Sequence, residues 1–125
     1  MAAPKILVVE DDPVILDLLV MSFELEGWTV VRASDGAEGL AVARAERPDA
    51  VVTDVMMPVH SGLDLLADLR GDADLASIPV VVLSARALDR DVEAGFAAGA
   101  DDYVTKPFEP DDLLERVEKL LGRRP

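Results

Sequence analysis

The chain lacks cysteine altogether and has only one histidine, one tryptophan, one tyrosine and three phenylalanines. Without cysteine there is no disulfide, no thiol catalysis and no cysteine-bound zinc or iron–sulfur site. Positive charge is also scarce, since 12 Lys and Arg stand against 25 Asp and Glu and give a net charge of −13. Such a charge repels phosphate groups, so we expect no direct contact with nucleic acid and none with an anionic membrane.

Long hydrophobic runs are missing as well. No apolar run approaches the roughly 20 residues that span a bilayer, and no signal peptide is visible before the first apolar stretch at residues 6–9. These absences, together with the lack of cysteine, predict a cytoplasmic protein. The length of 125 residues, half of them hydrophobic, predicts one folded domain over residues 1–125.

Short runs of β-branched and apolar residues recur five times along the chain, which is typical of parallel strands buried on both faces. They lie at residues 6–9, 29–31, 50–52, 80–83 and 103–104. Segments with helical spacing lie between and after them, at residues 13–26, 35–46, 62–70 and 88–98, followed by a last helix with an apolar stripe from Leu113 to Leu121. Three sequence signals mark helix starts: Asp12 with Pro13, Asp35 with Glu38, and Ser61 with Asp64.

Five strands alternating with five helices predict an α/β, flavodoxin-like, doubly wound (βα)5 fold. We expect a five-stranded parallel sheet in the order 2-1-3-4-5 with helices on both faces, because crossovers are right-handed. The first and third strands are then neighbours where the winding reverses. Ligands of such sheets bind there, outside the carboxyl ends of the strands.

Chemically active side chains stand at these strand ends. The first strand runs into Glu10, Asp11 and Asp12, and the third into Asp54, whereas Ser84 and Lys106 follow the last two strands. Asp12 is better explained as a helix cap, because Pro13 follows it. Three converging carboxylates repel one another unless a cation compensates, and Mg²⁺ fits a site with oxygen ligands only. A metal, a hydroxyl and an ammonium together can hold a phosphoryl group, with Asp54 as a ligand, a nucleophile or both.

Four motifs in this order resemble the receiver (CheY-like) domain of two-component response regulators over essentially the whole chain. The motifs are residues 6–12, residues 51–58 followed by Gly62, residues 82–85 and residues 99–108. The last motif, with Arg116, also resembles receivers of winged-helix regulators of the OmpR/PhoB type.

The resemblance implies a phosphoacceptor signalling switch in a two-component phosphorelay. Asp54 would take phosphate from a phosphohistidine on a sensor histidine kinase or phosphotransfer protein, in a Mg²⁺-dependent reaction with Mn²⁺ as a substitute. The implied metal ligands are Glu10, Asp11, Asp54 and the backbone carbonyl of Met56. The implied phosphoryl contacts are Ser84, Lys106 and the backbone of Ala85. Tyr103 would be a second switch residue, and Lys106-Pro107 matches a position where the family has a cis peptide.

Regulation and output are also implied by the resemblance. Met56 and Arg86 would tune the lifetime of the phosphorylated state, and Met56 predicts slow self-dephosphorylation because a thioether bonds water weakly. The face made by the helix at 88–98, the last strand and the last helix would bind a downstream protein or a second copy. In a homodimer, Asp101 and Asp102 would pair with Arg116 of the other subunit.

Three alternatives stay open for the same residues. A Mg²⁺-dependent phosphatase with an aspartate nucleophile commonly has a second acid two positions later, where this chain has Met56. A flavin carrier on this fold needs a hydroxyl-rich phosphate loop, and residues 10–12 would repel the phosphate instead. A receiver that docks partners without phosphorylation is the third. In the favoured interpretation the chain is no enzyme and catalyses only its own phosphorylation and dephosphorylation.

Overall fold

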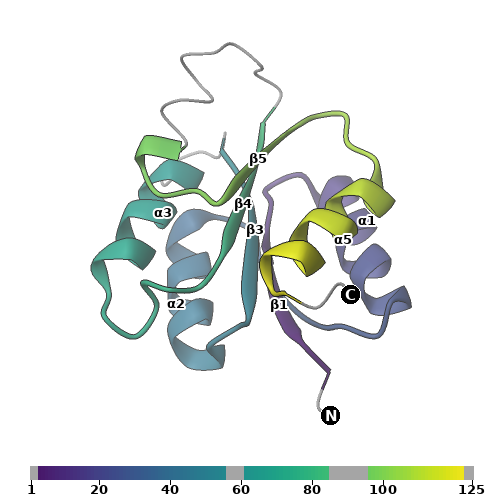
Figure 1. The fold of residues 1–125 in the computed structure, drawn as a ribbon. Coiled ribbons are helices and arrows are strands. Elements are labelled where there is room, and N and C mark those ends of the chain that lie inside the picture. Colours follow the sequence, from purple (N-terminus) through teal and green to yellow (C-terminus); the bar gives the residue numbers. More distant parts are fainter. Residues whose placement is uncertain (1–2, 56–60, 85–95, 123–125) are drawn as a thin grey trace.

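A computed structural model of the chain describes residues 3–55, 61–84 and 96–122. Five parallel strands form one sheet, with helices on both of its faces (Figure 1). The strands are β1 (Lys5–Val9), β2 (Thr29–Ala33), β3 (Ala50–Asp54), β4 (Val80–Ser84) and β5 (Asp102–Thr105). Their order is β2-β1-β3-β4-β5, which confirms the predicted fold class and makes β1 and β3 neighbours.

Helices cover the sheet in pairs. On one face lie α1 (Pro13–Leu25) and α5 (Pro110–Leu120), and on the other lie α2 (Gly36–Glu46) and α3 (Gly62–Gly71) (Figure 1). The helix predicted at 88–98 lies mostly outside the described residues. Of the part that the structure describes, residues 96 and 97 are helical. Within the described ranges, no helix is both long and apolar enough to cross a membrane.

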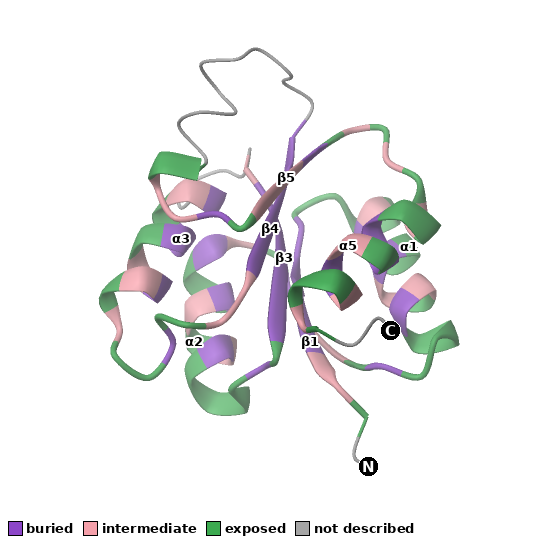
Figure 2. Ribbon diagram, in the orientation of Figure 1, coloured by how far each residue is buried: buried purple, intermediate pink, exposed green. Residues whose placement is uncertain are grey.

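Alternation along the strands divides the core in two. In β1, Ile6 and Val8 pack toward α1 and α5, whereas Leu7 and Val9 pack toward α2 and α3. The central strands β1, β3 and β4 are therefore buried on both faces, whereas the edge strands β2 and β5 are partly exposed (Figure 2). The short apolar runs in the sequence follow from this double burial.

The predicted caps form at the starts of three helices. Asp12 accepts hydrogen bonds from Val14 N–H at 2.9 Å and Ile15 N–H at 3.4 Å, with Pro13 in the first turn. Ser61 and Asp64 make both bonds of a capping box at the start of α3. At α2, Asp35 caps the N–H of Glu38 at 2.8 Å. The Glu38 carboxylate accepts from Ser34 N–H instead of Asp35 N–H, so this box is not reciprocal.

One arginine ties the starts of β4 and β5 to α3. Arg70, near the end of α3, donates to the carbonyls of Ala76, Ile78 and Gly99 and to the carboxylate of Asp101, over distances of 2.7 to 3.0 Å. Five bonds leave from its three nitrogens, which is as many N–H donors as a guanidinium has. The loop before β5 is therefore fixed at the end of the sheet opposite to the strand-end acids.

Candidate functional site

Two buried carboxylates meet where β1 and β3 end. In β1, side chains alternate between the two faces, so Glu10 follows Ile6 and Val8 on the α1/α5 side of the sheet. In β3, Asp54 follows Ala50 and Val52 on that same side. The register pairs Val9 with Thr53, so Glu10 and Asp54 are the next residues of two adjacent strands. Glu10 is 1% exposed and Asp54 is 4% exposed. Burial of two neighbouring acids is costly without a cation, so their placement indicates a binding site.

Asp11 completes an acidic cluster with these two residues. One carboxylate oxygen each from Glu10, Asp11 and Asp54 lie within 4.8 Å of one another, and Asp11 is exposed. Oxygen-only donors at this spacing, two of them buried, fit a small hard divalent cation that keeps some of its water. The prediction that these three residues converge is therefore confirmed by the geometry.

Lys106, the residue after β5, reaches the same two buried acids. Its Nζ lies 2.7 Å from Oε1 of Glu10 and 3.4 Å from Oδ1 of Asp54. Its backbone N–H donates to the carbonyl of Ser84 at 2.7 Å, which ties the end of β5 to the end of β4. The Lys106-Pro107 peptide is cis, as the sequence resemblance implies.

The charges of this cluster perturb one another. Burial raises the pKa of Glu10 to about 7 and the charge of Asp54 adds to that shift, although hydrogen bonds from Lys106 and from Asp12 N–H oppose it. Burial alone would lower the pKa of Lys106. The hydrogen bond to Glu10 and the charges of Asp54 and Glu10 outweigh burial, so the pKa of Lys106 is raised.

Ser84 and Tyr103 lie on the strands that complete the rim. Ser84 is fully buried as the last residue of β4 and pairs in register with Thr105. Tyr103 lies on β5 and packs, partly buried, against the α2/α3 side of the core. The other predicted contacts, Met56, Ala85 and Arg86, lie outside the described residues, so the structure does not bear on them.

The backbone of Asp54 is held by two residues to which the sequence interpretation gives no role of this kind. The Thr53 hydroxyl donates to the Asp54 carbonyl at 3.1 Å. Gly62, the first residue of α3, packs so closely that a Cβ there would lie 2.0 Å from the same carbonyl oxygen. Only glycine permits this approach of α3 to the end of β3. The position of Gly62, four residues after the motif that ends at Pro58, is the sequence signal that points to it.

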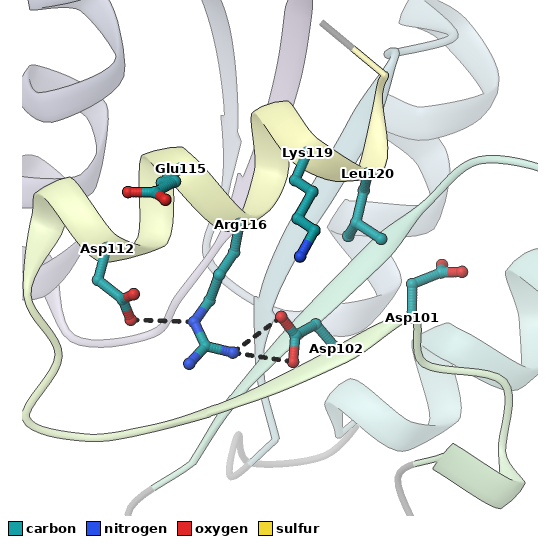
Figure 3. Close-up of a pocket in the computed structure, with 7 residues that line it drawn as sticks. All are labelled: Asp101, Asp102, Asp112, Glu115, Arg116, Lys119 and Leu120. Atoms are coloured by element: carbon teal, nitrogen blue, oxygen red, sulfur yellow. Dashed lines mark hydrogen bonds and ion pairs between the residues drawn. The ribbon is translucent and has the colours of Figure 1, made fainter. Parts of the chain in front are cut away.

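Away from the acidic cluster, a hollow of about 680 Å³ lies between β5 and α5 (Figure 3). Arg116 lies across it and donates both to Asp102, at 2.9 and 3.1 Å, and to Asp112 at 2.9 Å. Asp101 is bonded to Arg70 of the same chain at 2.8 Å. Within the chain, Asp101 thus pairs with Arg70 and Asp102 pairs with Arg116. The pairing of these acids with Arg116 of a second subunit stays a prediction, because a single chain does not test it.

The exposed side of α1 carries apolar side chains at helical spacing. Val14, Leu18, Met21 and Leu25 are all exposed, and they recur at intervals of four, three and four residues. Large apolar residues on an outer helix face, in one continuous stripe, mark an interaction surface more often than scattered exposed residues do. This stripe begins three residues after Asp11, beside the acidic cluster.

Comparison with known proteins gives a consistent family. The family model of the response regulator receiver domain matches residues 6–118. The chain is 45% identical over 118 residues to the probable transcriptional regulatory protein TcrX of Mycobacterium tuberculosis, covering 94% of this chain and 50% of that protein. It is 42% identical over 120 residues to the DNA-binding dual master transcriptional regulator RpaA of Synechocystis, covering 96% and 50%.

Solved structures agree with this assignment. The chemotaxis protein CheY4 of Vibrio cholerae superposes with a TM-score of 0.91 at 30% identity, covering 95% of this chain and 99% of that one. The receiver domain of the sensor histidine kinase PA1611 of Pseudomonas aeruginosa gives a TM-score of 0.89 at 30% identity, covering 97% and 99%. That structure has a magnesium ion coordinated in its active-site cleft.

The relatives correct one expectation drawn from charge. The chain spans about half the length of TcrX and RpaA, which are named as transcriptional regulators, and RpaA is named as DNA-binding. The expectation that nucleic acid plays no direct part is therefore wrong for proteins built on this domain. A net charge of −13 describes these 125 residues, and it cannot describe the other half of such relatives.

Proposed function

The chain belongs to the response regulator receiver domain family, and we propose that it acts as a phosphoacceptor switch in which Asp54 receives the phosphoryl group. The single observation that carries this proposal is the convergence of Glu10, Asp11, Asp54 and Lys106 on one end of the sheet. Three acids and one ammonium in this arrangement suit a phosphoryl group and a metal far better than they suit a fold-stabilising role.

The proposed reaction is a transfer from a phosphohistidine of a sensor kinase or phosphotransfer protein. A carboxylate oxygen of Asp54 attacks phosphorus, a P–O bond forms and the P–N bond breaks, and the leaving imidazole keeps the electron pair and takes a proton. Lys106 and the hydroxyl of Ser84 hold the transferred oxygens. The chain then catalyses only its own phosphorylation and the hydrolysis of its own acyl phosphate.

The acidic cluster is the proposed metal site. Glu10, Asp11 and Asp54 would hold Mg²⁺, with Mn²⁺ as a substitute, and the Met56 carbonyl remains a predicted fourth ligand. When bound, the cation neutralises phosphoryl oxygens that the three acids would otherwise repel. The backbone of Ala85 remains a predicted contact of the phosphoryl group.

The stripe on α1 is the surface that we propose for the phosphodonor. It starts three residues after Asp11, the exposed member of the cluster, and its exposed side chains Val14, Leu18 and Met21 have the spacing with which amphipathic helices pack together. A donor docked there would lie next to Asp11, the exposed acid of the site. Response regulators are typically cytoplasmic, so we place this exchange in the cytoplasm.

Output is proposed to run from Ser84 to Tyr103. Ser84 is the last residue of β4, beside the site. Tyr103, on β5, pairs in register with Val82, which lies two residues before Ser84 on β4. A shift of Ser84 toward the phosphoryl group would thus be transmitted through adjacent residues of β4 and β5. Met56 and Arg86 stay as predicted determinants of the lifetime.

Acetyl phosphate with Mg²⁺ tests the proposal. Intact-mass spectrometry should show one added phosphoryl group, and peptide mapping should place it on Asp54. The Asp54→Asn variant should gain no mass, whereas the Asp17→Asn variant, altered at an exposed acid of α1, should behave as the parent does. Modification of another residue, or unchanged modification of Asp54→Asn, would contradict the assignment.

A further inference from the structure

Lys106 is shared unequally between the two buried acids of the site. Its Nζ is 2.7 Å from Oε1 of Glu10, a hydrogen-bonding distance for an ammonium and a carboxylate. The distance to Oδ1 of Asp54 is 3.4 Å, which is long for such a bond. The side chain of Lys106 is 17% exposed and that of Glu10 is 1% exposed, so water screens this choice of partner little. Of the two acids, Glu10 is therefore the one that holds the ammonium at hydrogen-bonding distance.

Glu10 is itself held in place from the other side. Its second oxygen, Oε2, accepts from the backbone N–H of Asp12 at 3.2 Å. Asp12 is fixed in turn as the cap of α1, through its bond from Val14 N–H. The carboxylate of Glu10 is thus oriented by the turn between β1 and α1, with one oxygen on that turn and one on Lys106.

On this basis we propose that Glu10 is a positioning residue for Lys106, in addition to its proposed role as a metal ligand. Its carboxylate binds the ammonium and so keeps it from bonding directly to Asp54, but leaves it close enough to contact a phosphoryl group on Asp54. An ammonium bonded directly to Asp54 would lower the basicity of the attacking carboxylate and weaken it as a nucleophile. This inference rests on the proposed function for its consequence, but the position of Lys106 can be measured without phosphorylation.

The length of the glutamate side chain is the feature that matters. Aspartate at position 10 would keep the negative charge but withdraw the carboxylate by one carbon–carbon bond, about 1.5 Å. Lys106 would then lie closer to Asp54 than to position 10. A role in metal binding alone predicts instead that Glu10→Asp behaves as the parent once the metal is saturating.

Nitrogen-15 NMR of the lysine ammonium groups locates Lys106 directly. In the parent, scalar coupling across the hydrogen bond should join Lys106 Nζ to the carboxylate carbon of Glu10. In Glu10→Asp the coupling should move to the carboxylate carbon of Asp54. Glu10→Gln, which keeps the length but loses the charge, should move it in the same direction and serves if the aspartate variant folds poorly. Lys5, whose Nζ lies 3.0 Å from Glu46, is the internal control and should not change.

Phosphorylation by acetyl phosphate at saturating Mg²⁺ gives the functional arm. We expect the maximal rate of Glu10→Asp to fall by about three- to tenfold, because the attacking carboxylate is neutralised by Lys106. Coupling that stays on position 10 in both variants, or a maximal rate equal to that of the parent, would overturn the inference. A parent that is not phosphorylated at all would contradict the proposed function instead, and the NMR result would still decide which acid holds Lys106.

Discussion

The two ends of the sheet differ in how far their charged side chains are paired with groups of opposite charge. At the carboxyl edge, where strands end, Glu10 and Asp54 are buried together and share one ammonium, that of Lys106. At the amino edge, where strands begin, Arg70 donates five hydrogen bonds, and Lys5 bonds Glu46 through its side chain and Asp49 through its backbone. One edge keeps an excess of buried negative charge, and the other compensates its charges within the chain.

This difference separates the part of the domain that acts from the part that holds it together. Excess negative charge at the carboxyl edge destabilises the fold unless a cation or a proton arrives, which is the condition for binding one. At the amino edge the charged groups find partners within the chain, so we expect these bonds to contribute stability. Four substitutions probe this comparison.

The largest effect is expected at Gly62, because packing at the carboxyl edge is tight even though its charge is not compensated. In Gly62→Ala the new Cβ would lie 2.0 Å from the Asp54 carbonyl oxygen, so either α3 or the end of β3 must move. We expect the free energy of unfolding to fall by about 3 kcal/mol in urea titrations. Gly71 lies in the same helix, and a Cβ added there would meet no neighbouring atom within 4 Å. Gly71→Ala should therefore change the free energy of unfolding by less than about 1 kcal/mol. Equal losses would show that α3 is not packed against Asp54.

Next comes Arg70, the centre of the amino edge. Arg70→Met removes the donors to three backbone carbonyls and to Asp101, and we expect a loss of about 2 to 3 kcal/mol. Arg116→Met is the matched control on the other face of the sheet. Among the residues that the structure describes, Arg116 bonds the partly exposed carboxylates of Asp102 and Asp112, so its loss should cost about 1 kcal/mol or less. If the two variants lose the same stability, the backbone bonds of Arg70 contribute nothing.

Sequence patterns predicted more of the carboxyl edge than of the amino edge. Alternation and strand order were enough to bring Glu10, Asp54 and Lys106 together, because they determine which face and which end a residue occupies. They do not determine distances, so the preference of Lys106 for Glu10 over Asp54 could not be read from them. It depends on side-chain length and on the bond from Asp12 N–H.

At the amino edge the sequence carries almost no signal. Arg70 is one charged residue of an amphipathic helix, and nothing nearby predicts carbonyl partners 6, 8 and 29 residues away. Asp101 and Arg116 were expected to pair between subunits. That pairing stays a prediction, and no sequence pattern indicates the partners seen within one chain, where Asp101 pairs with Arg70 of α3 and Asp102 pairs with Arg116 of α5.

A smaller effect, of opposite sign, is expected at Glu10. Its pKa is about 7 in the folded domain and 4.5 ordinarily, so the folded state binds more protons between these values. Stability therefore falls as pH rises through 4.5 to 7, and the loss is complete above that window. With a chelator present, Glu10→Gln should be more stable than the parent by about 1 to 2 kcal/mol at pH 8 and by less at pH 5.

Urea titrations at several pH values measure this difference. Glu46→Gln, which alters an exposed acid at the amino edge, should keep the pH dependence of the parent. The comparison removes the general effect of the net charge, because both variants lose one glutamate. Parallel curves for the parent and Glu10→Gln would mean that Glu10 is not destabilised by burial.

The smallest effect is expected at Arg47, where the amino edge carries a strain of its own. Arg47 ends α2 with φ of 47°, and no other non-glycine residue in the described ranges has a positive φ. A left-handed backbone costs a non-glycine residue about 1 to 2 kcal/mol of stability. Glycine avoids this cost but loses about 0.5 to 1 kcal/mol more conformational entropy on folding than alanine does. Arg47→Gly should therefore be more stable than Arg47→Ala by about 0.5 to 1 kcal/mol in urea. Both variants lose the ion pair with Asp74, whose atoms lie 3.5 Å apart and whose side chains are mostly exposed, so that loss cancels. A gain for glycine would show that the backbone at the end of α2 is strained in the parent. Equal stability of the two variants would show that the left-handed conformation at position 47 carries no strain.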